Sequence, residues 1–349
     1  MAPPASDAGS SSLPPVGNAI IGQALSTDSA SPPTIPFASD WNTRQSLPPF
    51  RSLQDFIQHL CDRLPAEIAV AFRDLETGRE FLFNERQMMH AASTMKVPVM
   101  IEVFRQAEAN HSTPSSSTSP TTLPRFRLED SLLVKNEFKS IVDGSIYRMD
   151  IGEDSEESLY SFIGKKLTIG QLVEQMITVS SNLATNLLVD LIGVENIMRT
   201  LHTLGITNMK IRRGVEDIKA YRLGLNNQTD AMAMLLTLQA IAEKRAASPT
   251  ACETMLAMLK RQKFRDGIPA GLPQTLEVAH KTGSIVGIAH DCAIVFPKTV
   301  TPHTSKVHAT ARKPYLLVVL TSGLQDNIQA NRVIAEISGK IYREMVLLT

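Results

Sequence analysis

Hydrophobic positions along the chain follow two periods, and the period changes twice. Between residues 52 and 64, apolar side chains recur every three or four positions, which predicts an amphipathic helix. Strand character on both sides of Thr77-Gly78 then predicts a hairpin over residues 67–85. Near the C-terminus the pattern predicts three further strands and a closing amphipathic helix, at 276–284, 291–297, 313–323 and 327–346.

Helical periodicity dominates the middle of the chain. One helix is expected from about Ser93 to Ala109. Thr168 and Gln171 form a capping-box pattern ahead of the next apolar face, at 167–179. The segment 127–150 is mixed in character and predicts little. Further helices are predicted at 182–193, 194–205, 230–246 and 250–262.

This order predicts an α+β fold with one antiparallel sheet of about five strands, assembled from both chain ends and flanked by the first and last helices. We assign a sheet lobe to residues 49–92 and 275–349, and an all-helical lobe to residues 93–274. An active-site cleft is expected between the lobes. Residues 1–48, rich in Ser, Pro, Ala and Gly, predict a disordered leader. The polar stretch at 111–124 predicts a surface loop.

Composition excludes several classes of protein. The 349 residues, 43% of them hydrophobic, are enough for a sizeable core. Lys+Arg and Asp+Glu number 35 each, so no charge excess indicates a nucleic-acid partner, and a single Trp gives no base-stacking platform. No apolar run approaches the roughly 20 residues that span a membrane. The short apolar patch at 16–25 lacks the basic flank of a signal peptide.

Cysteine and histidine usage points to no metal site. An odd number of cysteines leaves at least one free thiol unless a pair forms between chains, and all three are expected as small buried residues. No metal or organic cofactor is expected. The histidines near the motifs below are expected to serve packing or hydrogen bonding. These cysteines and histidines are Cys61, Cys252, Cys292, His90, His280 and His290.

Ser93 and Lys96 form the pattern S-x-x-K at the head of an apolar run. Residues three apart share a helix face, so the hydroxyl and the amine point the same way. A lysine shielded from water can be neutral, and it can then take the proton that makes serine a nucleophile. Pro98 is tolerated only near a helix start, which places Ser93 close to the N-terminus. By itself, the pattern is more often a surface serine beside an extended lysine.

A second polar motif, "SSN" at residues 180–182, lies between two predicted helices. Ser181 or Asn182 can simply cap the following helix, which is the ordinary role of short polar residues at such a place. The motif gains weight only in combination with others.

A third motif, "HKTGS" at residues 280–284, lies inside a strand-like run. Gly283 weakens a strand and often marks the close approach of a ligand backbone. Lys281 and Thr282 at such a point can hold an anion. An ordinary edge-strand lysine beside a bulge is the alternative.

The three motifs occur together in the order typical of class A β-lactamases and penicillin-binding proteins. Over about residues 50–349 the chain resembles the class A serine β-lactamases of this superfamily. The resemblance implies a covalent acyl-enzyme, with Ser93 as nucleophile and Lys96 as its proton-transfer partner. It also implies that Ser180 relays a proton to the leaving lactam nitrogen.

The same resemblance assigns substrate binding to the second and third motifs. Asn182 would hold both Lys96 and a side-chain amide of the substrate, and the N–H groups of Ser93 and Ser284 would form an oxyanion hole. The substrate carboxylate would lie at the third motif. The substrate-binding residues are therefore Asn182, Lys281, Thr282, Gly283 and Ser284.

Deacylation depends on a loop glutamate that activates water in class A enzymes. Two registers compete in this chain. A match of the family's Leu-Asn pair to Leu225-Asn226 puts Arg222 at the glutamate position and predicts no base. A match by distance from Asn182 selects Glu216, which we prefer. The alternative for Glu216 is a solvated loop carboxylate.

Three departures from the family pattern are visible. Ser181 stands where the family most often has Asp, which predicts altered loop rigidity rather than lost chemistry. Ala220 stands where the family has Asn, so the deacylating water loses one partner. The stretch 288–295 lacks the usual carboxylate-binding Arg, a role that Arg212 or Arg213 could take from elsewhere.

The leading interpretation is a serine hydrolase that opens the β-lactam ring through an acyl-enzyme on Ser93, deacylated by water that Glu216 activates. One alternative is a penicillin-binding D-Ala-D-Ala peptidase or esterase with slow deacylation. Another is a non-catalytic β-lactam-binding sensor domain. A small-molecule substrate and a monomer are expected, and the chemistry predicts a periplasmic or secreted location. The segment 108–160 is longer than the family usually needs, and it could form a lid or rim.

Overall fold

The computed structural model describes residues 52–109, 126–297, 312–324 and 326–347. The predicted leader at 1–48 and the predicted surface loop at 111–124 lie outside these residues.

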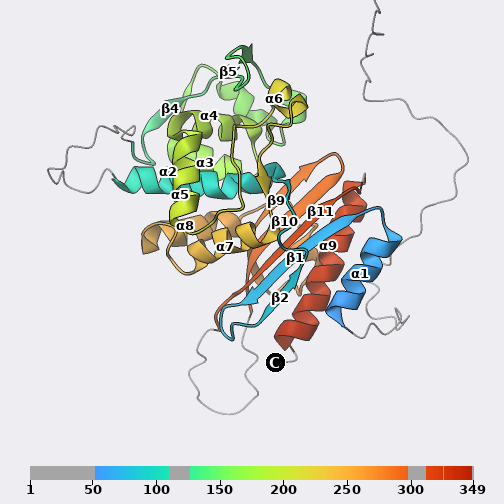
Figure 1. Cartoon of the computed structure of the whole chain (residues 1–349). Helices are drawn as coiled ribbons and strands as arrows, with labels where there is room; N and C mark the ends of the chain where they lie inside the picture. Colours follow the sequence, from blue (N-terminus) through green and yellow to red (C-terminus); the bar gives the residue numbers. More distant parts are fainter. Residues whose placement is uncertain (1–51, 110–125, 298–311, 325, 348–349) are drawn as a thin grey trace, which may run out of the picture. The chain divides into compact units, whose positions relative to one another are not determined.

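Strands from both chain ends form one five-stranded antiparallel sheet, which confirms the predicted architecture (Figure 1). The strand order is β2-β1-β11-β10-β9. β1 pairs with β11 along its whole length, from Glu67 opposite Ser322 to Asp74 opposite Tyr315. The strands are β1 (Glu67–Asp74), β2 (Glu80–Phe83), β9 (Glu277–Ile285), β10 (Ile288–Phe296) and β11 (Tyr315–Ser322).

β10 is longer than the sequence predicted. It begins at Ile288 rather than at residue 291, because residues 288–290 keep their pairing with both β9 and β11. Only Val286 and Gly287 separate β9 from β10, and Gly287 adopts the positive φ of +76° that a tight hairpin turn requires.

Helices cover both faces of the sheet (Figure 1). α1 (Leu53–Arg63) and α9 (Asn327–Ile341) contact one face, while α7 (Ala231–Ala242) and α8 (Pro249–Lys260) contact the other. The central strands are therefore buried along nearly their whole length and read as continuous apolar runs. The closing α-helix ends at Ile341, and a π-helical segment over Tyr342–Leu347 replaces its predicted last turns.

The remaining helices form the helical part of the molecule around a shared apolar core. The predicted capping box is confirmed, because Thr168 and Gln171 bond reciprocally. Ser181 caps the next helix by accepting from the backbone N–H of Ala184. These helices are α2 (Lys96–Ala109), α3 (Ile169–Thr178), α4 (Asn182–Ile192) and α5 (Val194–Thr203).

Short elements occupy the segments that the sequence left open. A five-residue helix, α6, was not predicted, because five residues show no helical period. Two 3-10 turns adjoin the cleft, η2 before α2 and η5 before β9. The short elements are α6 (Ile218–Arg222), β3 (Met89–His90), β4 (Ser131–Leu133), β5 (Phe138–Lys139), β6 (Ile146–Tyr147), β7 (Lys166–Thr168), β8 (Gln228–Thr229), η2 (Ala92–Met95), η3 (Ile151–Glu153), η4 (Glu157–Phe162) and η5 (Ile268–Gly271).

All three cysteines are free thiols. Cys252 and Cys292 are buried as predicted, but the prediction is wrong for Cys61, which is only partly buried at the edge of the apolar stripe of α1. In the part of the chain that the structure describes, no helix is long and apolar enough to cross a membrane. No group of three His, Cys, Asp or Glu side chains within the same residues could hold a metal ion.

Candidate active site

Ser93 lies in the 3-10 turn η2, immediately before α2. Pro98 falls in the first turn of α2, where its missing N–H costs no hydrogen bond. The Ser93 side chain is half-buried, and its hydroxyl has no hydrogen-bond partner among the described residues. It therefore faces the cleft as a free group.

Lys96 is fully buried, and its amine is held by the turn that carries the second motif. Lys96 Nζ donates to the backbone oxygen of Ser180 at 2.6 Å and to Asn182 Oδ1 at 2.7 Å. Ser180 Oγ lies 3.2 Å from the same nitrogen. A neutral amine has two hydrogens for the first two acceptors and a lone pair that can accept a proton from a hydroxyl.

Burial holds the pKa of Lys96 well below its ordinary value, and the positive charge of Lys281 lowers it further. The carboxylates of Asp154 and Glu216 act in the opposite direction and raise the pKa of Lys96. A larger fraction of the Lys96 amine is therefore neutral at a given pH than in an exposed lysine.

Lys281 approaches the same hydroxyl from strand β9. It is fully buried, and its Nζ donates to Ser180 Oγ at 2.9 Å and to the backbone oxygen of Thr282 at 2.8 Å. Burial lowers the pKa of Lys281 to about 7. Because both lysine amines meet at Ser180 Oγ, this hydroxyl can exchange protons with either of them.

Gly283 is required by a close approach, although not by the ligand that the sequence analysis expected. A Cβ at this position would lie 3.1 Å from the backbone nitrogens of Ser93 and Thr94, and 3.0 Å from Thr94 Cγ2. The approaching group is thus the chain's own backbone. The absence of a side chain at residue 283 lets β9, which includes Ser284, run directly beside the backbone N–H of Ser93.

The loop at 212–227 brings Glu216 to the same cleft. Asn186 fixes the loop by bonding both the N–H and the C=O of Val215, and Asp217 caps α6 through the N–H of Ala220. Glu216 Oε1 then accepts from Asn182 Nδ2 at 3.2 Å. Burial raises the pKa of Glu216, and the neighbouring charge of Glu153 raises it further.

Of the two loop registers, only the one through Glu216 brings a side chain to the cleft. Arg222 is exposed at the end of α6 and lines neither cavity described below.

Two arginines were candidates for binding the substrate carboxylate in place of the family's usual Arg. Arg213 donates to the backbone oxygens of Leu225 and Gly214 and to Asn226 Oδ1, while Arg212 is exposed.

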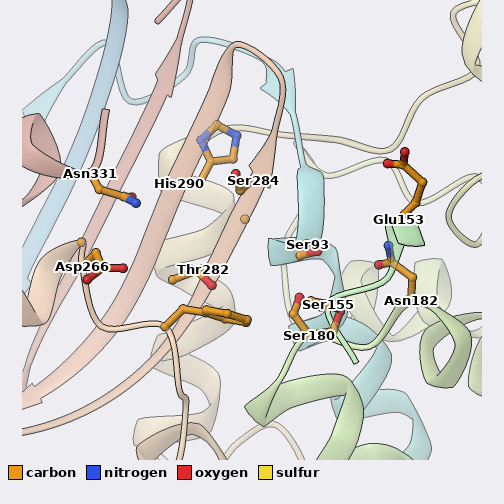
Figure 2. Close-up of a pocket in the computed structure, with 13 residues that line it drawn as sticks. Ser93, Glu153, Ser155, Ser180, Asn182, Asp266, Thr282, Ser284, His290 and Asn331 are labelled. Carbon is orange, nitrogen blue, oxygen red and sulfur yellow. Dashed lines mark hydrogen bonds between the residues drawn. The ribbon is translucent and has the colours of Figure 1, made fainter. Parts of the chain in front are cut away.

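Two adjoining cavities, of about 330 and 500 Å³, form the cleft. Ser93 lies between the third motif on one side, at Thr282 and Ser284, and the second motif on the other, at Ser180 and Asn182 (Figure 2). The residues that line both cavities, and so mark their junction, are Ser93, Glu153, Asn182 and Ser284. This size is typical of sites for small molecules.

Three residues at the cleft have a left-handed backbone conformation, which residues other than glycine rarely adopt. Ala92 has φ +44°, Ser180 +59° and Glu216 +61°. Such conformations cost roughly 1–3 kcal/mol each and persist only where the surroundings enforce them, which is common at functional sites.

The histidines near the motifs make hydrogen bonds, in line with the sequence analysis. His90 Nδ1 accepts from the N–H of Ala92, and His290 Nε2 lies 2.8 Å from the backbone oxygen of His90. His280 Nδ1 lies 2.9 Å from Asp291 Oδ1. Burial lowers the pKa of His90 to about 4.

Sequence reasoning missed the segment that borders the second motif. Glu153 and Ser155 line the cleft (Figure 2). Asp154 between them is buried and accepts from the N–H of Asn182. The sequence does contain a signal, because an Asp side chain often bonds the backbone N–H two residues further on in a turn. Asp154 Oδ1 accepts from the backbone N–H of Glu156 in this way, just before η4. Asp266 lines the opposite rim.

The fold thus carries a cleft in which the serine of an S-x-x-K pattern lies on the lining and its lysine is buried. A family model described as the β-lactamase enzyme family matches residues 52–122 and 125–345. The chain therefore belongs to the β-lactamase enzyme family. Solved structures of β-lactamases and of PBP-A share its fold.

Three solved structures illustrate the shared fold. A β-lactamase from Sphaerobacter thermophilus is 24% identical, with a TM-score of 0.61 over 81% of this chain and 92% of that one. PBP-A is 22% identical, with a TM-score of 0.66 over 86% and 99%. The chromosome-encoded β-lactamase of Vibrio parahaemolyticus is 16% identical, with a TM-score of 0.67 over 84% and 99%. No curated protein sequence matches.

Proposed function

We propose that this protein is a serine hydrolase that opens the β-lactam ring through a covalent acyl-enzyme. The observation that carries the proposal is the buried Lys96 amine, held between Ser180 and Asn182 with its pKa lowered by burial. Family membership and the class A-like fold support a hydrolase.

Acylation begins when Ser93 Oγ attacks the lactam carbonyl carbon and its proton passes to Lys96. The N–H groups of Ser93 and Ser284 stabilise the oxyanion that forms. The carbon–nitrogen bond then breaks, the carbonyl re-forms as a Ser93 ester, and Ser180 gives its proton to the departing nitrogen. Ser180 is reprotonated by a neighbouring lysine amine, which restores its hydroxyl.

Deacylation follows at the same carbonyl from the side of the loop. Glu216 accepts a proton from a water molecule as the water oxygen attacks the ester carbon. The ester bond to Ser93 Oγ breaks, this oxygen takes up the proton that Glu216 had accepted, and the ring-opened acid leaves. The raised pKa of Glu216 brings this base nearer to the working pH.

A penicillin-binding peptidase or esterase with slow deacylation is the second candidate. One observation favours it: Ala220, a fully buried apolar residue, occupies the place where the family provides a water-binding Asn. The similarity to PBP-A, of which one variant structure is described as an acyl-enzyme complex with penicillin G, also supports it. A non-catalytic sensor is the third candidate, and the organised lysines argue against it.

The test is intact-protein mass spectrometry after a pulse of penicillin G, read from milliseconds to hours. Transient acylation, with steady turnover of a chromogenic cephalosporin, is expected. A stable adduct without turnover would favour the peptidase, and no adduct on Ser93 would refute both. The proposal includes a monomeric protein, which sedimentation of the purified protein tests. It also includes a location outside the cytoplasm, which fractionation of the native host tests.

A further inference from the structure

A buried carboxylate supports the second motif from outside that motif. Asp154 is 7% exposed, and its two oxygens receive the first free N–H groups of helix α4. Oδ1 accepts from the N–H of Asn182 at 2.9 Å, and Oδ2 accepts from the N–H of Leu183 at 2.8 Å. The hydroxyls of Tyr160 and Ser181 also reach Oδ2, at 3.2 and 3.4 Å. A negative charge at a helix N-terminus is favourable.

The adjacent residue, Ser155, makes hydrogen bonds to the N-terminal side of the same turn. Ser155 Oγ donates to the backbone oxygen of Val179 at 2.7 Å and to that of Ser180 at 3.1 Å. Ser180 itself is held at φ +59°, a strained conformation for serine. The pair at 154–155 therefore surrounds the strained residue, with a carboxylate on its C-terminal side and a hydroxyl on its N-terminal side.

Among the described residues, this turn presents every hydrogen-bond partner of the Lys96 amine. The backbone oxygen and hydroxyl of Ser180 and Oδ1 of Asn182 are its three partners. A shift of the turn would move all three together. We propose that Asp154 is a positioning residue, which fixes the turn at 180–182 and thereby the Lys96 amine in the state that activates Ser93.

The motif itself supplies no carboxylate, because Ser181 stands at its central position. Ser181 is fully buried, and its hydroxyl lies 3.4 Å from Asp154 Oδ2. A second carboxylate at residue 181 would face the first within about the same distance, and such like-charge pairs are unfavourable. The site has room for one negative charge, and in this chain residue 154 supplies it.

The charge of Asp154 also acts on Lys96. The charged groups that face the Lys96 amine are Lys281, which lowers its pKa, and Asp154 and Glu216, which raise it, while burial has the largest effect. Removal of the Asp154 charge therefore lowers the pKa of Lys96 further. Acylation needs the neutral amine, so the acid limb of its pH profile moves to lower pH.

The inference rests on the proposed function only where penicillin is the probe. We would measure the rate of Ser93 modification from pH 5 to 9 in the full chain, with penicillin G and separately with a serine-directed fluorophosphonate. The second reagent forms a bond from Ser93 Oγ to phosphorus with loss of fluoride. It reports activation of the serine whatever the natural substrate is.

In Asp154→Asn, the amide can accept only one of the two N–H groups. We expect the rate of modification by either reagent at pH 7 to fall about tenfold to a hundredfold, the ratio that corresponds to one lost charge-assisted hydrogen bond. The acid limb should move to lower pH. Asp150→Asn is the matched control, since Asp150 is an exposed cap of the N–H of Gly152 and should behave as the parent.

The exchange variant Asp154→Ser with Ser181→Asp returns the carboxylate from the other side of the turn. Recovery of the rate and of the acid limb supports the proposal, also if Asp154→Asn does not fold. An exchange variant that fails to fold or to recover overturns it, as does a folded Asp154→Asn with the parent's rate and acid limb. A parent that reacts with the fluorophosphonate but not with penicillin counts against the proposed function alone.

Discussion

Replacement of Glu216 by glutamine separates the two halves of the proposed reaction. The glutamine keeps the side-chain length and an oxygen that can accept from Asn182 Nδ2, which lies 3.2 Å from Glu216 Oε1 in the parent. Only the basic carboxylate is lost. A positioned general base contributes about 10²–10⁴-fold to a rate, or about 2.7–5.4 kcal/mol of barrier.

Acylation of Glu216→Gln by penicillin G should therefore stay close to the parent rate, while release of the adduct slows by about 10²–10⁴-fold. Rapid-quench mass spectrometry measures both steps on one sample. The acid limb of acylation should move to lower pH, because the Glu216 charge raises the pKa of Lys96 in the parent.

Arg222→Gln is the matched control, because Arg222 occupies the glutamate place in the competing register but is exposed. It should release the adduct at the parent rate. The reasoning is refuted if Glu216→Gln deacylates as fast as the parent.

Three further outcomes are expected. In Glu153→Gln, loss of a charge that raises the pKa of Glu216 should move the acid limb of deacylation to lower pH, in a pH series of adduct lifetimes. Because the pKa of Lys281 lies at about 7, its cationic form is lost above that pH, so KM for a β-lactam carboxylate should rise from pH 7 to 9. Gly283→Ala places a Cβ 3.1 Å from the backbone nitrogen of Ser93, which should slow acylation and lower stability by about 1–3 kcal/mol, read by stopped flow and denaturant melts.

Each of these has a control. A β-lactam methyl ester should show no comparable rise in KM, so an equal rise for acid and ester would exclude Lys281 as the cause. An acid limb that stays in place in Glu153→Gln contradicts coupling to Glu216. Gly283→Ala with parent stability would mean that β9 can move away from the turn that carries Ser93.

The sequence predicted the fold well where apolar periods were long. The helix at 52–64, the three late strands and the capping box of α3 were read from period and cap chemistry alone. α6 was missed because its five residues carry no period, and β10 was predicted too short because His290 interrupts its apolar run.

The sequence does not show which residues of distant segments become partners at the candidate site. The motif residues follow from their order along the chain, but the contact of Asp154 is with a turn 28 residues further on, at Asn182. Arg213 was considered as a ligand for a carboxylate, whereas in the structure its guanidinium fastens the loop that carries Glu216. Such choices depend on which donors and acceptors meet after folding.

The sequence by itself determined the order of the elements and pointed to the proposed nucleophile, the two lysines and the glycine, because these follow from local period and motif spacing. Only the tertiary structure decided what surrounds them. It buried Lys96 and Lys281 against one hydroxyl, brought β9 against the backbone of Ser93, and placed the Asp154 carboxylate at the N–H groups of Asn182 and Leu183. The physical reason is that pKa values and hydrogen-bond geometry depend on neighbours in space, which a linear pattern does not contain.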